Sequence, residues 1–156
     1  MKRKTAKRII IIVILLGLIG GSYATYLYFM PHRDVQDTEA FATLSSDDLV
    51  KEYLKDPQKA NEKYLSSDGD SKVLIVNGLV YSSDVDQNGQ FVVLIKNNKN
   101  EAGISCTFLT TSKIKPDDFK KGVNIKIKGA IRSGASYDED LEMYEDVILE
   151  DCDIIK

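Results

Sequence analysis

Hydrophobic residues follow three different patterns along the chain. From Ile9 to about Met30 they are almost uninterrupted, between residues 45 and 65 they recur at helical spacing, and after residue 71 they alternate with polar residues. A helix repeats every ~3.6 residues and a strand every second residue. The pattern therefore predicts one long apolar helix, then a short helical segment, then a set of β-strands.

The apolar run over residues 9–30 is long enough to cross the ~30 Å hydrocarbon core of a bilayer as one helix. Residues 1–8 carry five basic residues and no acid, which favours the cytoplasmic side for this tail. Pro31 lacks an amide hydrogen, so we expect the helix to end there. The sequence predicts a signal anchor that crosses a bacterial inner (cell) membrane once, with the C-terminal part outside the cytoplasm.

A cleaved signal peptide is the alternative to an anchor. Ser22-Tyr23-Ala24 fits the pattern of small residues that precedes a cleavage site after Ala24. Hydrophobic residues resume at Tyr26–Met30, which makes the apolar stretch longer than a typical signal core and favours the anchor. Both interpretations export residues 33–156.

The segment after the apolar run divides into a linker and a helical region. Residues 31–44 show no clear period and are predicted to be a linker. Ser45 is a suitable N-cap for a helix, and Pro57 fits the first turn of a second helix. We therefore expect the exported domain to span residues 45–156, with helices over residues 45–65.

The rest of the chain reads as a small all-β domain. Five strands are predicted, at residues 72–82, 90–96, 103–109, 122–132 and 147–155. A short helix or irregular link over residues 111–121 separates the third strand from the fourth, and a loop over residues 133–146 precedes the fifth. This order favours a mainly β fold, a five-stranded OB-fold-like barrel whose ligand face lies between two loops. A β-meander or sandwich is the alternative.

Several stretches resemble a family of small, membrane-anchored bacterial proteins with a tRNA anticodon-binding-like OB fold. The matching residues are 31–35, 60–65, 76–80, 103–108, 122–123, 128–129, 147–149 and Cys152. The similarity covers residues 31–156, and its motifs are structural rather than catalytic. The resemblance implies the OB fold and, by analogy of fold alone, nucleic-acid binding. A fold does not settle a function.

Charge argues against a nucleic-acid partner. The whole chain has a net charge of −3, and without the basic residues of the first eight positions it keeps 16 basic against 24 acidic residues, a net charge of −8. Proteins that bind nucleic acid normally carry a basic face. We therefore predict a binding module for an envelope protein, peptide or glycan, with the bilayer as its second partner through residues 9–30.

Single-stranded nucleic acid remains the alternative ligand. Lys126, Lys128 and Arg132 form a basic edge on the fourth strand, to which Tyr81 or Phe91 would add a stacking surface. Lysines that alternate with isoleucine more often form only the solvent face of an antiparallel strand.

Two acidic loops are expected to flank the ligand groove. One contains Asp84 and Asp86, and the other, over residues 137–146, contains Asp140 and Glu142 among six acids. Such loops would favour a cation or a basic peptide, although charged loops of this kind are more often simply solvated. The candidate ligand-binding residues are Tyr81, Phe91, Lys126, Arg132, Asp84, Asp140 and Glu142.

A calcium-like motif occurs in the first of these loops. Asp84, Asp86, Asn88 and Gly89 match the first half of an EF-hand loop, but the twelfth position is Ile95 where a bidentate Glu is required. Asn-Gly is also a strong hairpin signal. The sequence therefore predicts a turn, with no metal and no cofactor.

The two cysteines, Cys106 and Cys152, fall in neighbouring predicted strands. Opposed residues of an antiparallel pair come close enough for a disulfide, and two buried thiols are the alternative. The one histidine, His32, lies at the expected membrane exit. We therefore predict no catalytic residue and no enzyme, with carboxylate-based hydrolysis as a weaker alternative that needs two acids about 5–10 Å apart in a cleft.

Overall fold

The structure is a computed structural model that describes residues 2–28, 34–67, 70–112, 114 and 116–155. It divides into two compact units, residues 1–33 and 34–156. The first unit contains one helix, α1 (Lys2–Tyr28). Within the described residues, none of the helices combines the length and hydropathy of a membrane span. Pro31 and His32, like the end of the predicted 9–30 span, lie outside the described residues.

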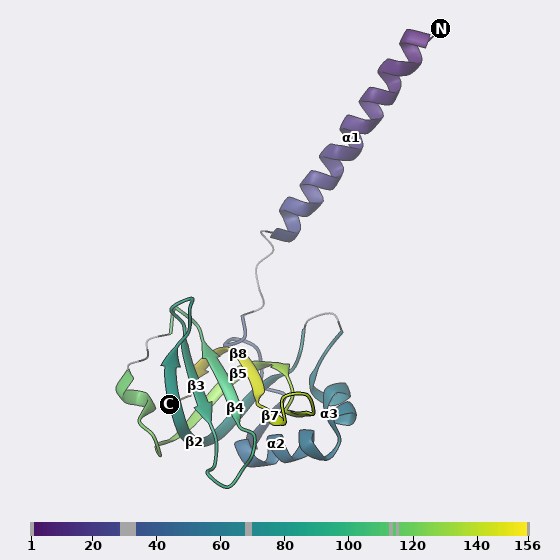
Figure 1. The fold of residues 1–156 in the computed structure, drawn as a ribbon. Coiled ribbons are helices and arrows are strands. Elements are labelled where there is room, and N and C mark those ends of the chain that lie inside the picture. Colours follow the sequence, from purple (N-terminus) through teal and green to yellow (C-terminus); the bar gives the residue numbers. More distant parts are fainter. Residues whose placement is uncertain (1, 29–33, 68–69, 113, 115, 156) are drawn as a thin grey trace. The chain divides into compact units, whose positions relative to one another are not determined.

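The second unit is a closed five-stranded barrel (Figure 1). Its strands are β2 (Val73–Val85), β3 (Phe91–Ile95), β4 (Ile104–Phe108), β5 (Asn124–Ser133) and β8 (Val147–Ile154). They are ordered β2-β3-β4-β8-β5, and β5 pairs again with β2. The β4–β8 pair is parallel and the other neighbouring pairs are antiparallel. The mainly β, five-stranded barrel expected from the sequence is confirmed.

Strand β2 closes the barrel because it serves two neighbours. Residues 73–79 pair with β5, and residues 80–85 pair with β3 across a register shift between Val80 and Ser82. Gly78 lies at this change of partner, where a Cβ would collide with the side chain of Ile95 and lie 2.5 Å from the Oγ of Ser46. Gly78 is therefore needed for close approach of the barrel wall and the preceding helix.

Two short helices pack against the barrel, at the right and lower right of the folded unit in Figure 1. In α2 (Ser46–Lys55), the Oγ of Ser45 accepts a hydrogen bond from the amide of Asp48 at 3.1 Å. Asp56 caps α3 (Pro57–Tyr64) in the same way through the amide of Lys59. The apolar side of α2 joins the barrel core, where Tyr53 is fully buried. The cap at Ser45 and the helix start at Pro57 agree with the prediction.

Residues 34–45 belong to the folded unit, so the predicted linker over residues 31–44 is wrong for its described part. Strand β1 (Ala42–Ser45) pairs in parallel with β2. The side-chain amide of Gln36 donates to the carbonyl of Asp151 at 2.7 Å, and Lys128 Nζ donates to the carbonyl of Gln36 at 2.6 Å. Such single, specific contacts leave no period in the sequence.

The predicted loop over residues 133–146 also contains secondary structure. Strands β6 (Ser136–Asp138) and β7 (Met143–Glu145) form a two-stranded antiparallel hairpin. The link between β4 and β5 contains one short 3₁₀ turn, η1 (Pro116–Phe119). The hairpin strands have three residues each, which is too short for a period of two to be recognised.

Candidate ligand-binding face

The β6–β7 hairpin is a small, ordered arm. Tyr137 and Tyr144 face each other across the two strands, with their ring centroids 4.8 Å apart. At the tip, Asp138 Oδ1 accepts hydrogen bonds from the amides of Asp140 and Leu141, at 2.9 and 3.0 Å. Glu142 then adopts a left-handed backbone conformation, with φ at 52°. These contacts hold the turn in one shape.

The base of the hairpin is fixed to the connection between β3 and β4. Asp146 Oδ1 accepts a hydrogen bond from the amide of Gly103 at 2.6 Å. The carboxylate of Glu101, in the same connection, raises the pKa of Tyr144 because it favours the protonated phenol. Ser136 Oγ donates to Glu145 Oε2 at 2.6 Å. The arm is thus anchored by groups from a loop that is distant in the sequence.

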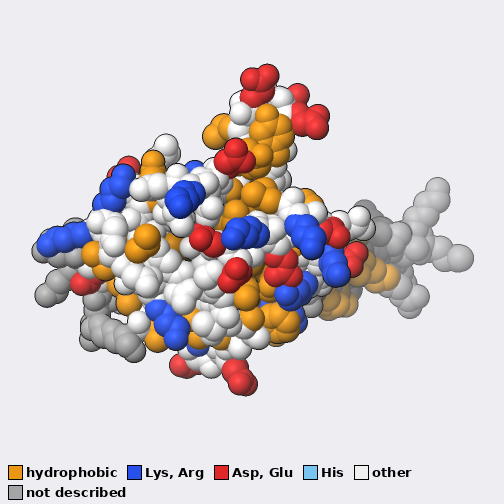
Figure 2. Space-filling view, turned by 90° about the horizontal axis from the view of Figure 1, so that it is seen from below, with side chains coloured by type: hydrophobic (Ala, Val, Ile, Leu, Met, Phe, Trp, Pro, Cys, Tyr) orange, Lys and Arg blue, Asp and Glu red, His pale blue; other side chains and the backbone are white. Residues whose placement is uncertain are grey.

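The hairpin exposes apolar side chains to solvent. Leu141 is 66% exposed, Met143 53% and Tyr137 49%, and Ile148 on the adjoining strand is 38% exposed. Figure 2 shows a narrow protrusion at the top of the view, apolar along its length and acidic at its tip, in the place that β6–β7 takes in Figure 1. By the register of the hairpin, Tyr137 lies on the face that it shares with Tyr144, and Met143 lies on the opposite face with Asp138. Several exposed apolar side chains on one short arm are typical of an interaction site.

A cavity of about 290 Å³ lies at the base of this arm. It is lined by Ser105, Ser133, Glu145, Asp146 and Ile148. The surrounding chain is strongly acidic, because residues 137–154 contain nine acids and no lysine or arginine. The cavity therefore combines two carboxylates, two hydroxyls and one apolar wall in an electronegative setting.

The predicted acidic candidates fall in two places. Asp140 and Glu142 lie on the hairpin tip, next to the cavity-bearing face. Asp84 lies at the end of β2, where its carboxylate accepts a hydrogen bond from the amide of Val85. Asp86 accepts from the amides of Asn88 and Gln90, both at 2.8 Å, and so forms the β2–β3 turn. Among the described residues, no group of three or more His, Cys, Asp or Glu is placed to hold a metal ion.

The basic edge of β5 is largely engaged within the domain. Lys126 is exposed, and it lies opposite Asn77 in the sheet. The ammonium of Lys128 is bonded to the carbonyl of Gln36, and Arg132 Nε lies 3.9 Å from Glu150 Oε2. Two of the three cations therefore already have partners, which weakens the predicted basic strip.

The two aromatic candidates also face other groups. The ring of Tyr81 is contacted by Lys121 Nζ at 4.5 Å from its centroid and by Lys96 Nζ at 6.0 Å. Phe91 is half-buried and packs on Phe119, with centroids 6.1 Å apart. Tyr81 is therefore grouped with lysines from two other loops, and Phe91 contributes to the core.

Cys106 and Cys152 are both free and buried, on β4 and β8. These strands run parallel, whereas the sequence led us to pair them antiparallel. Burial, and a hydrogen bond with Cys106, raise the pKa of the Cys152 thiol. A Cβ on Gly129 would lie 2.5 Å from the sulfur of Cys152, so this glycine makes room for it. Formation of a disulfide stays a prediction.

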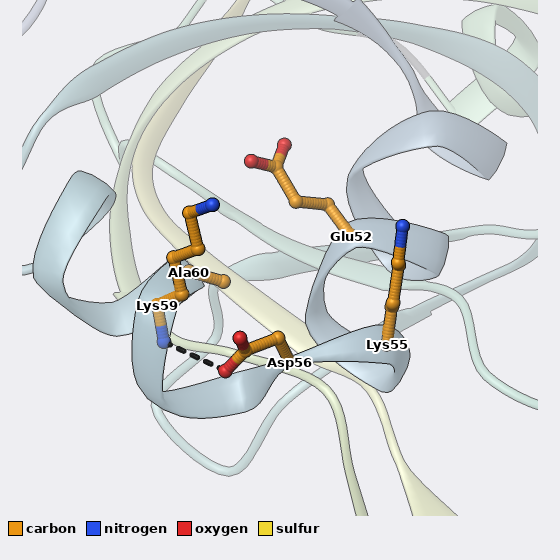
Figure 3. Close-up of a pocket in the computed structure, with 5 residues that line it drawn as sticks. All are labelled: Glu52, Lys55, Asp56, Lys59 and Ala60. Carbon is orange, nitrogen blue, oxygen red and sulfur yellow. Dashed lines mark hydrogen bonds between the residues drawn. The ribbon is translucent and has the colours of Figure 1, made fainter.

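A second cavity, of about 210 Å³, lies at the junction of α2 and α3 (Figure 3). Glu52 accepts hydrogen bonds there from Lys63 Nζ at 2.6 Å and Tyr64 Oη at 2.7 Å. Burial opposes ionisation of Glu52, but these two bonds outweigh it and hold its pKa below the ordinary value. Figure 3 shows Asp56 at the turn, bonded to the amide of Lys59. These polar groups join the two helices.

The sequence analysis missed the apolar side chains Tyr137, Leu141, Met143 and Ile148. The sequence does contain a signal for them, because residues 137–146 hold four apolar residues, Tyr137, Leu141, Met143 and Tyr144, among six acids. Only the hairpin shows that these side chains gather on one exposed arm.

Comparison with known proteins supports the fold. The model of a family described as tRNA_anti-like matches residues 1–140. Among solved structures, the chain is similar to a lipoprotein from Klebsiella pneumoniae subsp. pneumoniae MGH 78578 that is described, provisionally, as nucleic acid-binding. The two are 19% identical over 81% of this chain and 100% of that chain, with a TM-score of 0.53, so the likeness concerns the fold alone. Among curated proteins, none matches the chain.

Proposed function

The chain belongs to the tRNA_anti-like family, and we propose that it is a membrane-anchored, extracytoplasmic OB-fold module that binds a protein or peptide of the cell envelope. Its binding surface is the outer face of β4 and β8 together with the β6–β7 hairpin. It is a binding module rather than a catalyst, since both carboxylates of the cavity, Glu145 and Asp146, also hold the hairpin in place.

The observation that carries this proposal is the combination of exposed apolar side chains with acidic charge on one short arm and its base. Phosphate backbones are polyanions, and the segment from residue 137 to 154, which carries nine acids and no basic residue, repels them. Protein surfaces instead bury apolar groups, and Leu141 and Met143 offer more than half of their side-chain area for this.

Support for the membrane anchor comes from α1. Its described aliphatic side chains between Ile12 and Ile19 are all more than half exposed, and α1 is the one helix described in its own unit. A helix that is apolar on every face is stable only in an apolar environment. The basic residues before Ile9 favour an N-terminus in the cytoplasm, which directs residues 34–156 to the other side.

The location is tested by fusing alkaline phosphatase after Lys156, because this enzyme needs the oxidising exterior for its disulfides. We expect an active reporter in intact cells. A fusion to green fluorescent protein at the same position is the complementary control, and its fluorescence in the cytoplasm together with an inactive phosphatase would overturn the location.

Nucleic-acid binding is the second candidate, favoured by the name of the family and by the description of the Klebsiella lipoprotein. The test is titration of the full chain, in neutral detergent, with single-stranded dT20 and rU20 at 50 and 200 mM salt. We expect no saturable binding at either salt concentration. Binding at low salt that falls steeply at the higher concentration, and that Lys126→Gln weakens, would establish the alternative.

A further inference from the structure

We infer that the partner presents an extended segment in which arginine or lysine alternates with apolar residues, and that this segment docks on the β6–β7 hairpin. This inference rests on the proposed function and names the chemistry of the ligand. It follows from three properties of the described residues: the rigid apolar arm, the acidic cavity at its base, and the sign of the surrounding charge.

The apolar arm supplies the contact area. Leu141, Met143 and Tyr137 are between 49% and 66% exposed, yet the arm that carries them is held by the Tyr137–Tyr144 ring contact and the amide bonds of Asp138. Because the arm is already ordered, little conformational freedom is lost when a partner covers it. Such pre-organised apolar side chains are suited to act as anchors.

The cavity at the base supplies a place for a cationic group. Glu145 uses Oε2 for Ser136, and Asp146 uses Oδ1 for the amide of Gly103. In the part of the chain that the structure describes, no hydrogen bond reaches Glu145 Oε1 or Asp146 Oδ2. A guanidinium or ammonium group in the cavity would bond these two oxygens, while its aliphatic stem would lie on Ile148.

The acidic charge of the hairpin favours a basic apolar segment over an acidic or neutral one. Asp138, Glu139, Asp140 and Glu142 surround the apolar side chains of the tip, and Arg132, the basic group beside β8, is already near Glu150. An acidic or neutral apolar segment would bury these carboxylates without compensation. A segment that alternates cationic and apolar residues satisfies both the acids and the exposed leucine and methionine.

The test uses the fact that the chain has three methionines, Met1, Met30 and Met143. The full chain is labelled with ¹³C at the methionine methyl groups and kept in neutral detergent. It is titrated with ten-residue peptides of alternating Arg and Leu, alternating Glu and Leu, and alternating Arg and Ser. Met143 reports on the hairpin, and Met1 and Met30 report binding to the detergent or to the N-terminal unit.

We expect the Arg/Leu peptide to shift the Met143 signal saturably, and the other two peptides to bind at least about tenfold more weakly. Leu141→Ser should weaken binding of the Arg/Leu peptide by about tenfold, because it removes the most exposed apolar side chain of the hairpin. Val85→Ser, which removes an apolar side chain that is 49% exposed on β2, is the matched control and should leave binding unchanged.

Three results would overturn the inference: a Met143 signal that the Arg/Leu peptide does not move, equal binding of the Arg/Ser peptide, or a Leu141→Ser variant that binds as before. A photo-crosslinker at position 141 in intact cells distinguishes failure of the inferred basic segment from failure of the proposed function. If it captures an envelope protein while the peptides fail, the binding module stands and the basic segment does not. If it captures none, the module itself is refuted.

Discussion

The ring of Tyr53 lies directly against the backbone of Gly134, where any Cβ would collide with it. Tyr53 belongs to α2, and Gly134 follows β5 at the start of the connection that carries the β6–β7 hairpin. The fully buried ring therefore positions the chain where it leaves the barrel. Through this contact, α2 and the candidate ligand-binding arm depend on the same packing.

Gly134→Ala should destabilise the folded unit by about 1–3 kcal/mol, because the added methyl group overlaps the Tyr53 ring and neither the helix nor the strand end moves freely. The measurement is urea unfolding followed by circular dichroism. Tyr53→Leu combined with Gly134→Ala provides the control, since a smaller side chain should remove part of the penalty. If Gly134→Ala alone were as stable as the parent, the close contact between Tyr53 and Gly134 would be contradicted.

Tyr53→Phe and Tyr64→Phe should have opposite effects on stability. In the described structure Tyr53 Oη is buried without a hydrogen-bond partner, and burial raises the pKa of this phenol. Its removal should stabilise the unit by up to about 1 kcal/mol. Tyr64 Oη donates to Glu52 Oε2, so its removal should cost about 1 kcal/mol. The measurement is thermal unfolding of the two variants and the parent. Equal shifts in unfolding temperature would contradict the difference in hydrogen bonding between the two hydroxyl groups.

Stability should fall in acid partly through Glu52. Its folded-state pKa is lowered by the bonds from Lys63 and Tyr64, so its contribution is present above the pKa of the unfolded chain and is lost as pH falls through the folded value. We therefore expect the parent to be more stable than Glu52→Gln at pH 7, and this difference to shrink as pH falls below the ordinary glutamate pKa of about 4.3. Unfolding curves between pH 3 and 8 measure this, and Glu62→Gln, an exposed acid on α3, serves as the control. A constant difference across this range would refute it.

The two thiols should be unreactive in the folded protein. Cys106 and Cys152 are fully buried, and the raised pKa of Cys152 disfavours its thiolate. Under native conditions we expect no reaction with a thiol reagent, and two reactive groups per chain after unfolding without reductant. If no group reacts even after unfolding, the cysteines are paired, and the disulfide alternative is correct. Cys152→Ala reports the signal of Cys106 alone.

The sequence alone determined most of the secondary structure and the class of the fold. The alternation in residues 124–131, the cap at Ser45 and the helix start at Pro57 are local signals, because they depend on the period of one strand or on the backbone of one turn. The order of strands then allowed few topologies, and the five-stranded barrel followed. The acidic character of the β5–β8 connection could also be predicted from its composition.

Tertiary structure alone decided which side chains remain available to a ligand. Lys128 is bonded to Gln36, 92 positions earlier, and Gly103 is bonded to Asp146, 43 positions later. Such pairs leave no period, since each depends on a single contact between segments that meet only when the barrel closes. The same closure buries Phe91 in part and leaves Leu141 and Met143 outside. For this reason the acidic segment could be predicted from the sequence, whereas the exposed apolar arm could be recognised only from the tertiary structure.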